Sequence, residues 1–207
     1  MVESKNKVRR VDALSKDRIV LAAVEILDAS GEGGLTTRSL AASLNTGSGA
    51  IFHHVGSRDE LLRTAVDSVI ADVTAGMAHE GTPEESIRML MLGVFDAIQA
   101  HPWVGAQLAR EPWQPALLEI FFEIGSRLQL LGVPEAELFD AASTLLGYLL
   151  GVASQHAAAV NLSRNTDRAN RRASSDHPFA PHVTRLADHD DRVQFVAGVE
   201  IILAGIA

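Results

Sequence analysis

Residues 36–55 constrain the fold most, because they predict two short helices joined by a tight turn. Thr36 can cap the first helix, which ends near Leu44. Asn45-Thr46-Gly47 then forms a turn, and the second helix covers residues 48–55. Two short helices in this order form a helix-turn-helix, and in DNA-binding proteins the second helix enters the major groove.

The second helix has the surface that such a role requires. A recognition helix presents small or polar side chains to the groove, and Ser48, Gly49, Ala50 and His53 fit that requirement. The free amides at its start, together with Arg58 on the next helix, can hold backbone phosphates. Short helix pairs also occur in many helical proteins, so the spacing alone is compatible with other functions.

The whole chain predicts an all-α fold of about nine helices, because apolar residues recur at helical spacing and strand-like alternation is nearly absent. Besides the two short helices, the expected helices cover residues 15–30, 57–79, 83–100, 103–110, 115–132, 134–160 and 193–206. Residues 161–190 are polar and are expected to form a loop or a frayed helix.

Three parts follow from this pattern. Residues 1–14 are expected to form a flexible basic arm. Residues 15–62 form the three-helix head with the helix-turn-helix, and residues 63–207 form a larger helical bundle.

The charge of the chain is unevenly distributed. The net charge is −8, yet residues 1–65 hold nine Lys/Arg against eight Asp/Glu, and the acidic surplus belongs to the remainder. Because salt screens exposed charges beyond about 8–10 Å, an acidic body does not prevent a locally basic head from binding DNA.

Other classes of protein receive little support. The chain has no cysteine, no signal-peptide pattern and no apolar run long enough to span a membrane, so we expect a soluble cytoplasmic protein without membrane contact. We find no nucleotide-binding, serine-hydrolase or zinc-protease motif, and we therefore expect neither an enzyme nor a cofactor. Adjacent His53 and His54 point about 100° apart on a helix, and no third ligand is evident, so no metal site is expected.

Residues 15–65 closely resemble the DNA-binding head of the TetR family of bacterial transcriptional regulators. From Gly34 the chain runs GLTTRSLAASLNTGSGAIFHHVGSRDELL. The matching elements are Leu35-Thr36-Thr37-Arg38, Leu40-Ala41, Leu44, Ile51-Phe52-x-His54-Val55, and Ser57-Arg58 ahead of Leu61-Leu62. Beyond residue 65 only the layout is similar: a helical body ending in a long helix, a loop and a last helix.

The resemblance implies a role for each matching residue. Arg38 occupies a position that can reach a base edge, Thr36 and Thr37 lie where the helix start contacts phosphate, and Arg58 anchors the backbone. The predicted DNA-binding residues are Thr36, Thr37, Arg38, Thr46, Gly47, Ser48, Gly49, Ala50, Phe52, His53, His54 and Arg58.

The head departs from the family pattern at three positions. Asn45 stands where the turn usually has Gly, and Asn tolerates the left-handed conformation better than most residues. Gly47 replaces a Ser or Thr cap, which is a weaker choice. Phe52 replaces a common Tyr, so one hydroxyl–phosphate bond should be missing.

The resemblance also implies that the body dimerises and binds a small molecule. We expect a homodimer through residues 138–160 and 191–206, because a last helix that is apolar on most sides needs to be covered. Prolines beside two tryptophans suggest interrupted helices, which can leave a cavity for a largely apolar effector. The candidate pocket residues are Phe95, His101, Trp103, Trp113, Phe121, Tyr148 and His156, although aromatic residues at helical spacing are as often simply core.

The sequence therefore predicts a TetR-like regulator. It would repress transcription by binding a palindromic operator as a homodimer, and a small, largely apolar effector would release it. The alternatives are a helical protein–protein interaction module and, less favoured, an enzyme.

Overall fold

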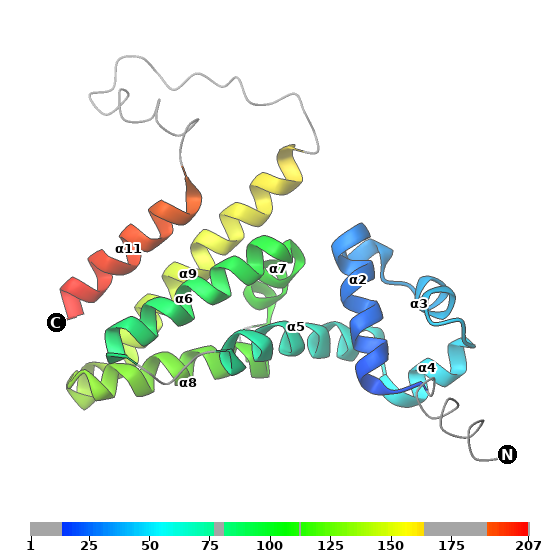
Figure 1. Cartoon of the computed structure of the whole chain (residues 1–207), viewed down its shortest axis with the longest axis horizontal. Coiled ribbons are helices and arrows are strands. Elements are labelled where there is room, and N and C mark those ends of the chain that lie inside the picture. The colour runs from blue at the N-terminus through cyan, green and yellow to red at the C-terminus, as the bar shows by residue number, and fades with distance from the viewer. Residues whose placement is uncertain (1–13, 77–80, 112, 164–189, 207) are drawn as a thin grey trace, which may run out of the picture. The chain divides into compact units, whose positions relative to one another are not determined.

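The computed structural model describes residues 14–76, 81–111, 113–163 and 190–206. These residues form nine α-helices and no strand, which confirms the predicted all-α fold (Figure 1). The helices are α2 (Lys16–Gly34), α3 (Thr37–Ser43), α4 (Ser48–Val55), α5 (Arg58–Ala75), α6 (Pro83–Ala100), α7 (Pro102–Arg110), α8 (Pro115–Leu130), α9 (Glu135–Ser163) and α11 (Asp191–Ile206).

The chain divides into two compact units, residues 1–71 and 72–207, which we call the head and the body. The division falls within α5, as does the boundary predicted after residue 62. The predicted basic arm, apart from residue 14, and most of the predicted loop at 161–190 lie outside the described residues.

The helix starts follow local capping chemistry. Thr82 begins α6 with a complete capping box: the Glu85 amide donates to the Thr82 hydroxyl at 3.2 Å, and the Thr82 amide donates to the Glu85 carboxylate at 2.8 Å. The hydrogen bond from the Thr82 amide to the carboxylate holds the pKa of Glu85 below its usual value. In the head, Ser15 accepts the Arg18 amide at the start of α2. The expected break after Ser30 appears as a non-helical Gly31 with φ +64°, after which α2 continues for one short turn.

The core of the head comes from four helices. α2, α3 and α4 pack against one another, and α5 adds buried leucines. The largest fully buried side chains of the head are Ile19, Leu27, Leu35, Leu40, Ile51, Leu61 and Ile70. Leu35 and Leu40 lie on either side of the α3 start in the spacing of a hydrophobic staple, and both are buried.

The body is a bundle in which α9 packs against α6, α7, α8 and α11 (Figure 1). A stack of three aromatic rings joins α6, α11 and α9: Phe195 lies 4.5 Å from Phe95 and 5.4 Å from Tyr148, both nearly parallel. Gly198 allows this approach, because a Cβ at that position would overlap the Tyr148 ring. We call Phe95, Phe195 and Tyr148 the aromatic stack.

Two ion pairs also fasten α11 to α6. Arg88 donates two hydrogen bonds to Glu200, at 2.5 and 2.9 Å, and Arg192 donates two to Asp96, at 3.0 and 3.2 Å. Bidentate arginine–carboxylate pairs fix orientation as well as distance. The last helix is therefore held to the body by both apolar and charged contacts.

Candidate nucleic-acid interface

The start of α3 is organised by a local hydrogen-bond network. The Ser39 amide donates to the Thr36 hydroxyl at 3.0 Å, and the Thr36 amide donates to the Ser39 hydroxyl at 2.9 Å. Thr36 and Arg38 are exposed, and Thr37 is half-buried. The cap occupies the Thr36 hydroxyl, so Arg38 is the side chain of this turn best placed to reach outward.

The turn between α3 and α4 has the conformation that its sequence suggests. Asn45 adopts φ +49°, which confirms that an Asn here takes the left-handed conformation where the family usually has Gly. The Thr46 amide donates to the Ala41 carbonyl at 3.0 Å, and this bond closes the turn. The half-buried Thr46 and the exposed Gly47 therefore lead directly into α4.

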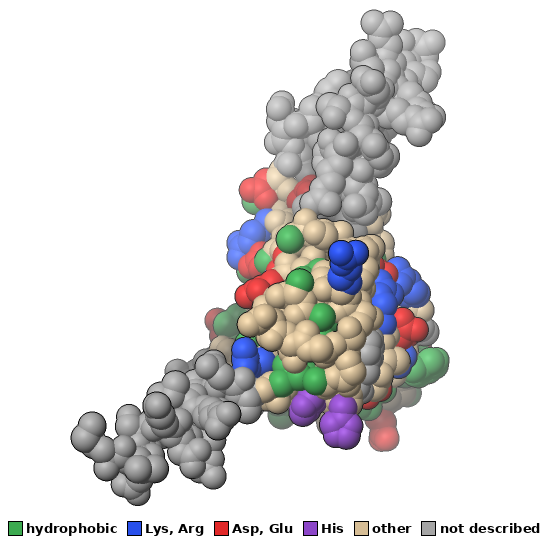
Figure 2. Space-filling model, turned by 90° about the vertical axis from the view of Figure 1, so that its right-hand side faces the viewer, with side chains coloured by type: hydrophobic (Ala, Val, Ile, Leu, Met, Phe, Trp, Pro, Cys, Tyr) green, Lys and Arg blue, Asp and Glu red, His purple; other side chains and the backbone are tan. Residues whose placement is uncertain are grey.

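One face of α4 is open to solvent. Ser48, Gly49, Ala50, His53 and His54 are all exposed, whereas the alternate face, with Ile51 and Val55, is buried. A Cβ added at Gly47 or Gly49 would meet no other atom within 4 Å. Figure 2 shows this side of the head, with two adjacent histidines at its edge. The exposed face is small and polar, so the main chain can approach a flat ligand such as a base-pair edge.

The side chain of Phe52, a predicted DNA-binding residue, lies outside the described part of the chain. Its main chain belongs to α4. The rings of His53 and His54 lie 5.8 Å apart, and no group of three potential metal ligands occurs among the described residues.

Arg58, the predicted phosphate anchor, binds two main-chain groups of the head. Its Nε donates to the Leu35 carbonyl at 2.8 Å and its Nη2 to the Glu32 carbonyl at 2.5 Å. The physical reason is that Glu32 and Leu35 end a helix whose last turn has no basic residue of its own. Leu35 and Glu32 lie 23 and 26 positions before Arg58 in the sequence, so local sequence patterns cannot reveal these two hydrogen bonds.

The part of the head that the structure describes is not basic. Residues 14–71 hold five Lys/Arg and seven Asp/Glu, a net of −2, whereas residues 1–13 hold four against two. Attraction to phosphates therefore depends on the few exposed cations of the helices, on helix amides and on the chain before residue 14.

Several of the predicted pocket residues contact other aromatic side chains. Phe95 and Tyr148 belong to the aromatic stack. His101 and Trp103 meet edge to face at 6.1 Å, and Phe121 meets Phe139 at 5.7 Å.

Trp113 and His156 are the two remaining predicted pocket residues. Trp113 is 78% exposed in the connection between α7 and α8, so it does not line an enclosed site. The side chain of His156 lies outside what is described.

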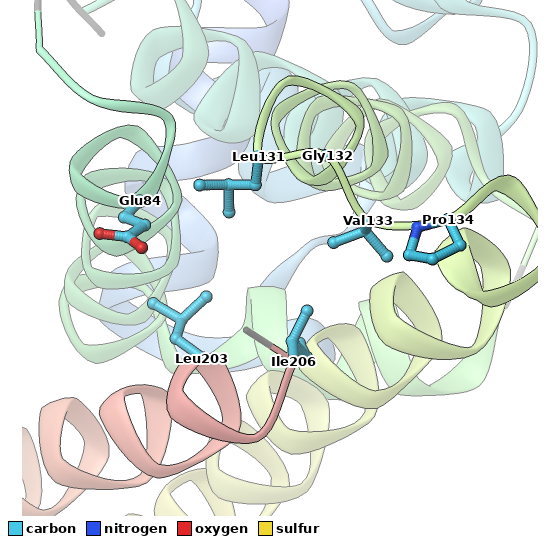
Figure 3. A pocket seen from close by; sticks show the side chains of 7 residues that line it. All are labelled: Glu84, Leu131, Gly132, Val133, Pro134, Leu203 and Ile206. Carbon is cyan, nitrogen blue, oxygen red and sulfur yellow. The ribbon is translucent and has the colours of Figure 1, made fainter.

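A cavity of about 220 Å³ lies elsewhere in the body. Figure 3 shows apolar side chains around it from the α8–α9 turn and the end of α11, with the Glu84 carboxylate at its edge. Its lining residues are Glu84, Leu131, Gly132, Val133, Pro134, Leu203 and Ile206, none of which was predicted. Turn geometry at Gly132, with φ +86°, shapes one wall.

Sequence reasoning missed a buried polar residue on α7. Gln107 is only 5% exposed, and its side-chain oxygen has no hydrogen-bond partner. Its main-chain carbonyl accepts from the Gln114 side chain at 3.2 Å. Its burial could have been predicted from the sequence, because Gln107 shares the apolar helix face of Trp103, Val104 and Leu108. A buried acceptor without a partner has lost its contact with water without a compensating hydrogen bond, which is costly.

The outer side of α11 is apolar. Phe195, Val199 and Leu203 face the body core, whereas Val193 and Ile201 are exposed, Ile201 by 74%. On α9, which contacts α11, Gly147 and Gly151 are exposed, with open space around them. We call Val193, Ile201, Gly147 and Gly151 the outer α9–α11 face.

Comparison with known proteins gives a consistent result. No protein-family model matches the chain. The solved structure of the transcriptional regulator SCO7222, a TetR from Streptomyces coelicolor, is 42% identical, with a TM-score of 0.80 over 94% of this chain and 98% of that one.

Two further relatives are also similar to this chain over most of its length. ActR from S. coelicolor in complex with actinorhodin is 26% identical, with a TM-score of 0.71 over 93% of this chain and 95% of that one. A curated HTH-type transcriptional regulator from Saccharopolyspora erythraea is 26% identical over 94% of this chain and 85% of its own length. No helix among the described residues is long and apolar enough to cross a membrane.

Proposed function

Because the chain belongs to the TetR family of DNA-binding transcriptional regulators, we propose that it is a homodimeric repressor that an effector releases from a palindromic operator. The observation that carries the proposal is the exposed face of α4, where Ser48, Gly49, Ala50 and His53 offer small and polar groups and no large apolar side chain. Such a surface suits the major groove better than it suits a protein partner.

The proposed contacts divide between bases and phosphates. Arg38 binds a base edge, with guanine as the favoured partner, because its guanidinium is exposed at the start of α3. The main chain of Gly47 and Gly49 and the side chains of Ser48, Ala50 and His53 lie against the groove. Thr37, Thr46 and His54 lie where they can contact the backbone, and the cap at Thr36 orients them by fixing the α3 start.

Dimerisation supplies the second half-site. One helix-turn-helix contacts too few base pairs for a unique site, and paired heads bind half-sites about 34 Å apart. The outer α9–α11 face supports a symmetric interface because it joins exposed apolar groups with small residues that permit close helix approach. The predicted interface through residues 138–160 and 191–206 includes this face.

The effector is proposed to bind within the body and to favour a conformation with low operator affinity. The relative ActR has been solved with actinorhodin, which supports a small-molecule site in proteins of this fold. The unpartnered oxygen of Gln107, beside the buried Trp103, suggests that the effector is largely apolar and carries one hydrogen-bond donor. Trp113 is largely exposed and is not part of the proposed site.

A selection of DNA tests the operator proposal. The full chain is mixed with a random duplex library, and bound duplexes are recovered and sequenced over several rounds. We expect a palindrome whose half-sites are one helical turn apart, and we expect affinity to fall with salt. Recovery of no preferred sequence, with salt-insensitive or absent binding, would favour a protein–protein interaction module instead.

The effector is tested separately on the selected duplex. Actinorhodin and a panel of apolar compounds with and without a hydroxyl group are added, and operator affinity is measured by fluorescence anisotropy. We expect a hydroxylated compound to weaken binding, and Gln107→Leu to reduce that response while leaving DNA binding unchanged. If no compound alters operator affinity, the inducer proposal fails while the repressor proposal stands.

The remaining proposals concern the cellular compartment and the absence of enzymatic activity. We propose that the protein acts in the cytoplasm, because a bacterial operator is found there, and that it has no catalytic activity of its own. Turnover by the purified chain in a substrate panel would contradict the second statement.

A further inference from the structure

Helix α2 has an irregular C-terminus. Gly31 departs from helical geometry, and no basic residue occupies the last turn. The last carbonyls of a helix carry partial negative charge and lack intrahelical partners. Here the Leu35 amide returns to the Glu32 carbonyl at 3.2 Å, and the carbonyls of Glu32 and Leu35 still accept a positively charged group from elsewhere.

Arg58 supplies that group from the first turn of α5. Two different nitrogens of one guanidinium bind the two carbonyls, and a third nitrogen, Nη1, lies 3.8 Å from the Asp59 carboxylate. The side chain is 44% exposed, so it is held in place while remaining at the surface of the head. We call the Arg58 guanidinium with the Glu32 and Leu35 carbonyls the Arg58 clamp.

The clamp lies directly before the DNA-facing residues of α3. Leu35, whose carbonyl accepts from Arg58, is followed by the cap residue Thr36 and then by Thr37 and Arg38. The side chain of Leu35 is buried, which fixes the same residue from the opposite side. The clamp therefore restrains where the first turn of α3 lies relative to α5.

We propose that Arg58 is a positioning residue for operator recognition, holding the start of α3 in the geometry from which Arg38 contacts its base. This inference rests on the proposed function, because it needs operator binding as its readout. It differs from a phosphate contact in its chemistry: the guanidinium hydrogens directed at Glu32 and Leu35 are used inside the head.

The proposal explains why the residue is Arg. A planar guanidinium presents several donors in a fixed fork, whereas the ammonium of Lys is a single compact charge. Lys is nonetheless a good phosphate ligand. Substitution by Lys therefore separates the two roles, because it preserves a phosphate contact and disrupts a clamp on two carbonyls.

The test compares Arg58→Lys and Arg58→Met with the wild-type chain on the selected duplex. Affinity is measured at several salt concentrations and on duplexes altered at each base pair, at a temperature where thermal melts show the head folded. Arg63→Met, on the same helix, is the control for loss of one positive charge.

We expect both Arg58 variants to bind the operator roughly tenfold more weakly, because each loses hydrogen bonds made by a charged group. The slope of log affinity against log salt should stay unchanged, and base preference at the pair contacted by Arg38 should relax more than at the pairs under α4. A general loss of stability alone would not change base preference in this selective way.

Three outcomes would overturn the proposal. Wild-type affinity in Arg58→Lys, together with a shallower salt slope in Arg58→Met, would identify a phosphate ligand. Unchanged affinity in both variants would show that the clamp has no influence on recognition. Unfolding of the head in both variants would assign the clamp to stability rather than position. Failure of the wild-type chain to select any duplex is a different result, because it concerns the proposed function.

Discussion

The head and the body of this chain are both helical, but they expose different kinds of surface. Among the exposed large apolar side chains that the structure describes, only Leu21 belongs to the head; the others lie in the body and are Met89, Trp113, Phe122, Leu130, Phe139, Val193 and Ile201. The open face of α4 instead carries serine, glycine, alanine and histidine. Contact with DNA needs close approach and polar groups, whereas association between proteins gains free energy from apolar burial.

The two regions also differ in how their helices are held. In the head, local caps and the Arg58 clamp bind main-chain groups at helix ends. In the body, the aromatic stack and two arginine–carboxylate pairs join side chains far apart in sequence. We therefore expect substitutions in the head to act on DNA binding and substitutions in the body to act on assembly or stability.

The largest expected effect comes from a carboxylate in the proposed DNA interface. Gly49→Glu should weaken operator binding by about 3 kcal/mol, roughly a hundredfold or more, because it adds bulk and negative charge against the groove. The fold should be retained, since a Cβ at Gly49 meets no other atom within 4 Å. Anisotropy on the selected duplex measures the loss.

Gly125→Glu is the matched control for that substitution, because Gly125 lies on α8 with equally open surroundings. It should leave operator affinity unchanged. Equal weakening by both substitutions would mean that the effect is not specific to the head.

The next effect concerns assembly. Ile201→Asp should weaken the dimer by about 2 kcal/mol or more, because it places a charge in the proposed apolar interface. Sedimentation velocity across a concentration series should then show monomer. Leu130→Asp is the control, since Leu130 is 75% exposed on α8, outside the outer α9–α11 face. A dimer that tolerates Ile201→Asp and dissociates with Leu130→Asp would place the interface elsewhere.

A smaller effect concerns packing within the body. Gly198→Ala should destabilise the body by about 1–3 kcal/mol, because the new methyl group overlaps Tyr148 and forces α9 and α11 apart. Chemical denaturation measures the change. Tyr148→Phe keeps the ring and removes the hydroxyl, which donates to the Gln194 and Phe195 carbonyls at 3.3 Å. Combining it with Gly198→Ala should restore little stability, because the ring itself remains in the way.

The smallest effect is on the acid dependence of stability. Arg88 holds the pKa of Glu200 below its usual value through two hydrogen bonds. A carboxylate with a lowered folded-state pKa stabilises the fold above its unfolded-state pKa, about 4.3 for glutamate, and this contribution is lost as the pH falls through the folded-state value.

Both partners of that pair are more than one third exposed, so the contribution at neutral pH should be about 0.5 kcal/mol. Glu200→Gln should therefore flatten the loss of stability between neutral pH and pH 3.5, as measured by thermal melts. Asp140→Asn, at an exposed carboxylate of α9, is the comparison. An acid profile that Glu200→Gln leaves unaltered would show that the ion pair is too solvated to matter.

Much of the architecture follows from short stretches of sequence. Thr36 and Asn45 take the cap and turn conformations that the sequence suggests, because each is governed by residues within a few positions. The helix-turn-helix and the other described helices could also be predicted from short stretches of sequence, since helical periodicity and capping are local properties. The exposed face of α4 follows as well, because the spacing of Ile51 and Val55 decides which side is buried.

Other features depend on residues that only the folded chain brings together. The role of Arg58 depends on carbonyls more than twenty residues earlier, and the stack of Phe95 and Tyr148 depends on Phe195 from the last helix. The neighbouring proline marked Trp113 as a candidate pocket residue, yet the path of the chain leaves its side chain in solvent. Local sequence determines which residues form a helix and which side is apolar, whereas the partner that each side chain meets is set by the packing of helices distant in sequence.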